Sequence, residues 1–108
     1  RSDGGHAGGL FTVTPAMAAG GARPGWFPYF HAPDVDATLA RAVQLGATVM
    51  MPAWSAEPGR MAMLADPHGA PFYLMAPVPP PGQPDATSDV FAPSKPGHCR
   101  WNELQTPD

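Results

Sequence analysis

A chain of 108 residues with a net charge of −3 and only six Lys and Arg residues supports one small domain without a basic patch. This balance predicts no binding to nucleic acid or to an anionic membrane surface. The single cysteine, Cys99, excludes an internal disulfide and is typical of the reducing cytoplasm, where we expect the protein. The apolar runs are too short for a membrane span. The 16 Pro and 12 Gly residues indicate a compact part joined to structureless segments.

The first part of the chain predicts two strands and a helix. Residues 1–25 form a Gly-rich flank in which LFTV, at 10–13, is a short strand candidate and 15–25 a loop. Residues 26–31 predict a second strand, which Pro28 places at a sheet edge or bulge. Asp34 is a good helix N-cap, apolar residues then follow helical spacing, and Gly46 is the stop signal.

The second part predicts three strands followed by a linker. A strand at 48–51 is expected to end at Pro52, and a hairpin of strands 60–65 and 71–75 turns at 66–69, DPHG. Residues 78–97 are Pro-rich and predict an extended linker. In the tail, 98–108, CRWNELQ alternates polar and apolar residues like a strand.

Two segments carry a resemblance to a known family. PYFHAPDVDATLARAVQLGATVMMP and LADPHGAPFYLM resemble the strand, Asp-capped helix and Asp-Pro-x-Gly hairpin of the glyoxalase, bleomycin-resistance and extradiol-dioxygenase (vicinal oxygen chelate) superfamily. The resemblance implies an α+β fold with one βαβββ module at 26–77. Residues 1–25 then resemble the end of a preceding module and 98–108 the start of a following one, as in a fragment of a tandem-domain member. Pairing with a second copy would complete a cup-shaped sheet.

The resemblance also implies where a metal would bind. The family's ligand positions on the first strand of a module fall on Phe27 and Trp101, and the position on the last strand falls on Tyr73. Aromatic side chains are unsuitable ligands for a first-row metal at such sites. We therefore expect no metal and no cofactor in the cup.

Strand alternation predicts what replaces the metal ligands. Residues two apart on a strand share a face, so the cup acquires an aromatic and Met lining, which suits a flat or apolar molecule. Trp54 is expected in a loop at the rim. The same residues would also serve to pack a dimer core. The predicted ligand-binding set is Phe27, Tyr29, His31, Trp54, Met63, Tyr73, Met75, Trp101 and Glu103.

The predicted function is metal-independent binding of an apolar or aromatic small molecule by a homodimer, rather than catalysis. Two alternatives stay open. One is an enzyme of the lyase, isomerase or hydroxylase type in which His31 acts as acid or base. The other is a truncated structural module without a ligand. A metal site built from His31, His98 and Cys99 matches no known ligand spacing.

Overall fold

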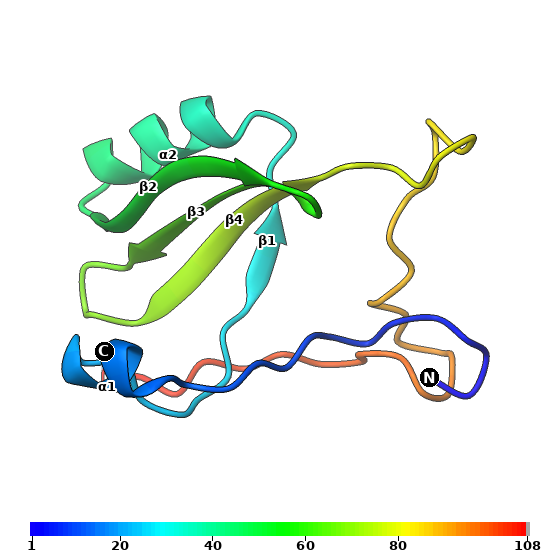
Figure 1. Ribbon diagram of the computed structural model, residues 1–108, viewed down its shortest axis with the longest axis horizontal. Coiled ribbons are helices and arrows are strands. Elements are labelled where there is room, and N and C mark those ends of the chain that lie inside the picture. The colour runs from blue at the N-terminus through cyan, green and yellow to red at the C-terminus, as the bar shows by residue number, and fades with distance from the viewer. Residues whose placement is uncertain (108) are drawn as a thin grey trace. The chain divides into compact units, whose positions relative to one another are not determined.

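The computed structural model describes residues 1–107, which form two compact units, residues 26–84 and residues 1–25 together with 85–107. Asp108 lies outside the described residues. The first unit contains β1 (Tyr29–His31), α2 (Val35–Gln44), β2 (Thr48–Ala56), β3 (Gly59–Ala65) and β4 (Pro71–Pro77) (Figure 1). The predicted α+β class and the βαβββ order are confirmed.

The four strands form one sheet in the order β1-β4-β3-β2, with α2 against one of its faces (Figure 1). β1 pairs in parallel with β4, whereas β2–β3 and β3–β4 are antiparallel. A parallel pair needs a long crossover, and α2, β2 and β3 all lie in the chain between β1 and β4. In this strand order β1 and β2 are the two edges of the sheet.

Local signals account for α2. Asp34 Oδ1 accepts a hydrogen bond from the Ala37 amide at 3.0 Å, which satisfies one free N–H at the helix start. After the helix, Gly46 adopts φ +101°, a left-handed conformation that favours glycine. The apolar side of α2 packs on the sheet. The buried core consists of Ala32, Val35, Ala62, Leu64 and Leu74.

β2 differs from the prediction because it does not end at Pro52. The strand continues to Ala56, and its pairing with β3 shifts register between Val49 and Met51 and again between Met51 and Trp54. Pro52 has no N–H to donate to the ladder, and such a residue is tolerated at an edge strand or a bulge. The shift brings Trp54 opposite Met61, whereas Ala53 packs against the core. Trp54 thus lies in a strand, not in a rim loop.

The second unit contains less regular structure than predicted. Residues 10–13 form no strand, and a short helix, α1 (Pro15–Ala19), stands where a loop was expected; the Thr14 side chain caps it. The tail strand is also wrong: within the described residues 99–107 the only ladder contact is one bridge between Phe91 and Cys99. A strand persists only where a neighbour pairs with its backbone, and alternation alone does not provide one.

No helix among residues 1–107 is both long and apolar enough to cross a membrane.

Candidate functional site

The sheet face opposite α2, here called the open face, is rich in aromatic and Met side chains. The strand register shows which residues share it: Tyr73 lies between Tyr29 of β1 and Met63 of β3, and Met75 lies between His31 and Met61. Leu64 and Leu74, at alternate positions, belong to the core under α2. Alternation therefore places on one face the residues that the sequence predicted to share it.

Three aromatic rings gather around Tyr73 on the open face. Tyr29 stacks on it with ring planes 2° apart and centroids 4.4 Å apart. Phe27 and Trp54 meet the same ring edge-on, at centroid distances of 6.1 and 6.4 Å. These are the offset and T-shaped arrangements that aromatic quadrupoles favour. The cluster is built from three parts of the chain: Phe27 just before β1 and Tyr29 at its start, Trp54 in the shifted part of β2, and Tyr73 in β4.

Two rings of the aromatic cluster, Phe27 and Tyr73, occupy positions where the family resemblance puts metal ligands. Phe27 and Tyr73 are neighbours in space, as a pair of ligands would be. Phe27 has no donor atom, and Tyr73 is enclosed by three rings. Within the described part of the 26–84 unit, no three His, Cys, Asp or Glu side chains lie close enough to share an ion. The donor set of the open face does not fit the family's metal.

The polar groups of the open face are few. Burial raises the pKa of the Tyr29 phenol, and the neighbouring Tyr73 adds to the rise, so this hydroxyl stays protonated at neutral pH. The Tyr29 side chain is nonetheless half exposed, at 49%. His31 is exposed at the end of β1, in register with Met75. The face thus offers phenol hydroxyls and one imidazole beside a large aromatic area.

Two predicted site residues lie in the other unit. Trp101 is 77% exposed, and its indole Nε1 donates to Glu103 Oε2 at 3.1 Å. Cys99 Sγ lies 3.4 Å from Asn102 Oδ1. These contacts are local along the tail.

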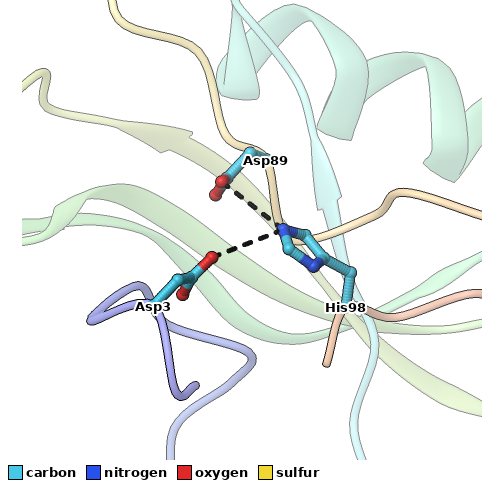
Figure 2. A group of neighbouring side chains, drawn as sticks. All are labelled: Asp3, Asp89 and His98. Atoms are coloured by element: carbon cyan, nitrogen blue, oxygen red, sulfur yellow. Dashed lines mark ion pairs between the residues drawn. The ribbon is translucent and has the colours of Figure 1, made fainter. Parts of the chain in front are cut away.

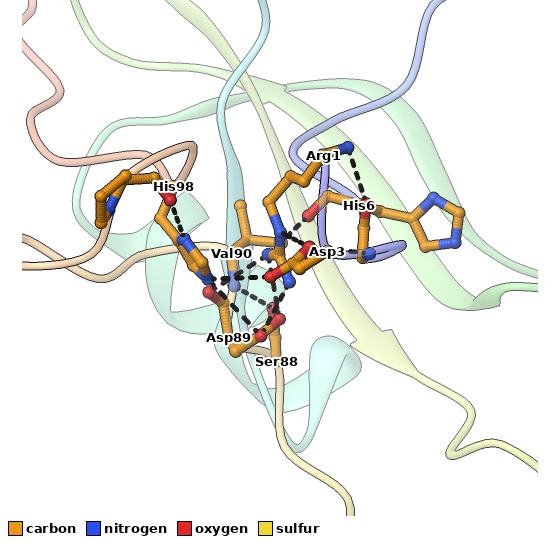
Figure 3. Close-up of polar contacts among 9 residues, drawn as sticks. Arg1, Asp3, His6, Ser88, Asp89, Val90 and His98 are labelled. Atoms are coloured by element: carbon orange, nitrogen blue, oxygen red, sulfur yellow. Dashed lines mark hydrogen bonds and ion pairs between the residues drawn. The ribbon is translucent and has the colours of Figure 1, made fainter.

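A second group of polar residues, in the unit of residues 1–25 and 85–107, was missed by sequence reasoning. Arg1 binds two carboxylates: its Nε lies 3.0 Å from Asp3 Oδ1 and its Nη2 2.8 Å from Asp89 Oδ2 (Figure 3). His98 completes the group, with Nε2 3.6 Å from Asp89 Oδ2 and 4.0 Å from Asp3 Oδ2 (Figure 2). No local spacing connects residues 3, 89 and 98, so no sequence signal could have found them.

Arg1 keeps both carboxylates of this second group ionised. Its hydrogen bonds hold the pKa of Asp3 at about 2 and lower the pKa of Asp89 below its ordinary value. The Gly5 amide also donates to Asp3 Oδ1, at 3.0 Å. The group therefore presents two anionic oxygens toward the imidazole of His98.

Comparison with known proteins finds similarity over part of the chain. Residues 5–75 match the sequence profile of the family described as Glyoxalase-like domain. The chain is 47% identical over 56 residues to the anthracycline biosynthesis proteins DauV of Streptomyces sp. (strain C5) and DnrV of Streptomyces peucetius, which covers 52% of this chain and 20% of each relative. It is 44% identical over 55 residues to "Putative glyoxylase CFP32" of Mycobacterium bovis, covering 50% of this chain and 21% of that protein.

The matched segment spans about a fifth of the length of each of these relatives. The family match, in contrast, covers most of this chain, from within the Gly-rich flank to residue 75 in β4. The chain belongs to the glyoxalase-like domain family.

Proposed function

We propose that this protein binds a planar aromatic or otherwise apolar small molecule on its open face, without a metal ion. The observation that carries the proposal is the cluster of Phe27, Tyr29 and Trp54 around Tyr73. Two of its members, Phe27 and Tyr73, stand where the family resemblance puts metal ligands. Aromatic rings offer a large contact area at a low entropic cost, and neighbouring Met side chains adapt to the shape of a ligand. Hydroxyls at the rim of the cluster supply orientation.

The named relatives suggest the class of ligand. Two are named for anthracycline biosynthesis, and anthracyclines are fused-ring aromatic compounds. A fused-ring system would stack on the Tyr29 and Tyr73 rings, which are already parallel to one another. We therefore propose a polycyclic aromatic ligand.

A second copy of the chain would supply the other wall of the cup. β1 and β2 are edges of the sheet, and β2 exposes Val49, Met50 and Met51, an apolar run that water solvates poorly. Burying the open face and the β2 edge of one copy against another would remove apolar surface from water. Light scattering after size exclusion should give twice 11.3 kDa; a monomer that still binds the ligand would refute the dimer and leave the binding proposal standing.

Binding is testable with 1-hydroxyanthraquinone, a three-ring aromatic. In a Trp26→Phe/Trp101→Phe background Trp54 is the one remaining tryptophan of three, so quenching of its fluorescence reports a ligand on the open face. We expect saturable quenching that is unchanged by EDTA or by added Zn2+ or Mn2+. Quenching that requires a metal would refute metal independence, and absence of saturable quenching would favour a structural module without a ligand.

One observation favours a catalytic alternative. His31 is exposed on the open face, where an imidazole could move a proton to or from a bound molecule, and one relative is named a glyoxylase. This alternative predicts turnover in a screen of 2-oxoaldehydes and catechols that His31→Gln abolishes while anthraquinone binding persists. Absence of turnover by the wild-type chain would dismiss it.

A further inference from the structure

We propose that Asp3, Asp89 and His98 bind one divalent transition-metal ion of the Zn2+ or Mn2+ type. The three ligand atoms lie within 4.8 Å of one another (Figure 2). All three residues belong to the unit formed by residues 1–25 and 85–107, and none belongs to the open face. The site is independent of the proposed ligand-binding function.

His98 is oriented by a hydrogen bond from one of its ring nitrogens. Its Nδ1 lies 2.8 Å from the Pro96 carbonyl oxygen, and since a carbonyl only accepts, Nδ1 carries the proton. Nε2, the other ring nitrogen, then faces the two carboxylates (Figure 3). The side chain is only 6% exposed. A metal-binding histidine is oriented in this way, with its second ring nitrogen donating to a backbone carbonyl.

The three ligand atoms are spaced closely enough to share an ion. The imidazole Nε2 lies 3.6 Å from Asp89 Oδ2 and 4.0 Å from Asp3 Oδ2. Ligands about 2.1 Å from a tetrahedral ion lie roughly 3.4 Å apart. The two nitrogen–oxygen separations are slightly larger than this spacing, and all three ligand atoms lie within 4.8 Å of one another, so a modest approach of the side chains would hold such an ion.

Arg1 contacts the carboxylates of both Asp3 and Asp89. Its Nε contacts Asp3 Oδ1, whereas the other oxygen, Asp3 Oδ2, faces His98. On Asp89 it contacts both oxygens, at 3.1 and 2.8 Å. Arg1 thus holds both carboxylates in place, as outer partners hold the carboxylates of metal sites. Its positive charge opposes a second cation, so we expect weaker binding than at a structural zinc site.

The donor set selects the kind of ion. One imidazole nitrogen and two carboxylate oxygens suit borderline first-row ions, and waters would complete the coordination. Ca2+ prefers six to eight oxygen ligands, and Mg2+ keeps most of its own waters. We therefore expect Zn2+ and Mn2+ to bind and Ca2+ not to compete.

Calorimetric titration of the full chain with Zn2+ tests the site. We expect one ion per chain, with binding weakened at least 10-fold by Asp89→Asn and by His98→Gln. His6→Gln is the matched control, because only the backbone carbonyl of His6 contacts Arg1 and its ring lies outside the group (Figure 3). Far-UV circular dichroism establishes that each variant keeps the wild-type secondary structure.

A measurement on the unmutated chain covers the case in which a variant does not fold. In a Mn2+ titration followed by NMR, paramagnetic broadening should reach the ring protons of His98 before those of His31 or His68. Broadening that begins at another histidine, or Zn2+ binding that His98→Gln leaves intact, would overturn the proposal. Absence of Zn2+ binding at millimolar concentration would do the same.

Discussion

Replacing Tyr73 by Leu should weaken both the fold and the ligand-binding face. The substitution keeps an apolar side chain in β4 but removes three ring contacts, one stacked at 4.4 Å and two edge-on at 6.1 and 6.4 Å. Each aromatic pair contributes about 0.5–1.5 kcal/mol beyond its buried area. Because the edge-on pairs are distant and Tyr29 is half exposed, we expect a loss of about 1.5–2.5 kcal/mol in the free energy of unfolding.

The matched control is the neighbouring residue on the other side of the sheet. Phe72 makes one aromatic contact, with Phe30 at 5.7 Å, on the face that packs against α2. Phe72→Leu should therefore remove about 0.5–1.5 kcal/mol and leave anthraquinone binding intact. Urea unfolding followed by circular dichroism separates the two variants, because with m of about 1 kcal/mol/M a difference of 1 kcal/mol moves the midpoint by about 1 M.

The reasoning would be refuted if Phe72→Leu destabilised the protein as much as Tyr73→Leu. That result would mean that the rings on the open face do not stabilise one another in solution. Equal retention of anthraquinone binding by both variants would instead separate the cluster from ligand recognition.

Three further predictions concern the scaffold. Leu64→Ala, at a fully buried position, should cost about 2–5 kcal/mol in urea unfolding. Gly59→Ala should destabilise the protein more than Gly69→Ala. Both glycines have positive φ, but a Cβ at Gly59 would overlap a backbone carbonyl of β4, whereas a Cβ at Gly69 would meet open space. Equal thermal midpoints of the two variants would contradict this prediction. The hydrogen bond from Arg60 lowers the pKa of Asp36 in the folded protein. The pair therefore stabilises the fold above pH about 4, the unfolded pKa of Asp, and this stabilisation is lost as the pH falls through the lower pKa of the folded state. Asp36→Asn should reduce the fall of the urea midpoint at acid pH.

The sequence predicted most of the open face because the signals there are local. Strand alternation places Tyr29 with His31, and Tyr73 with Met75, on the same face without knowledge of the partner strands. The placement of Trp54 failed for a local reason, since Pro52 was interpreted as a strand end although it marks an edge-strand bulge. Pro52 was thus the one signal that could have located Trp54 correctly.

What the sequence determined by itself is the module: the Asp34 cap, the helix that Gly46 ends, the hairpin turn after Ala65, and aromatic residues at Phe27 and Tyr73. Each depends on backbone preferences over a few residues.

Only the tertiary structure decided which distant residues meet. The parallel pairing of β1 with β4 stacks Tyr29 on Tyr73, and the register shift in β2 adds Trp54 to them. In the other unit, folding brings Asp3 and Asp89 to His98. Such contacts join residues that are far apart in the sequence, so they require the closure of long loops. The residues between them contain no pattern that identifies the two partners.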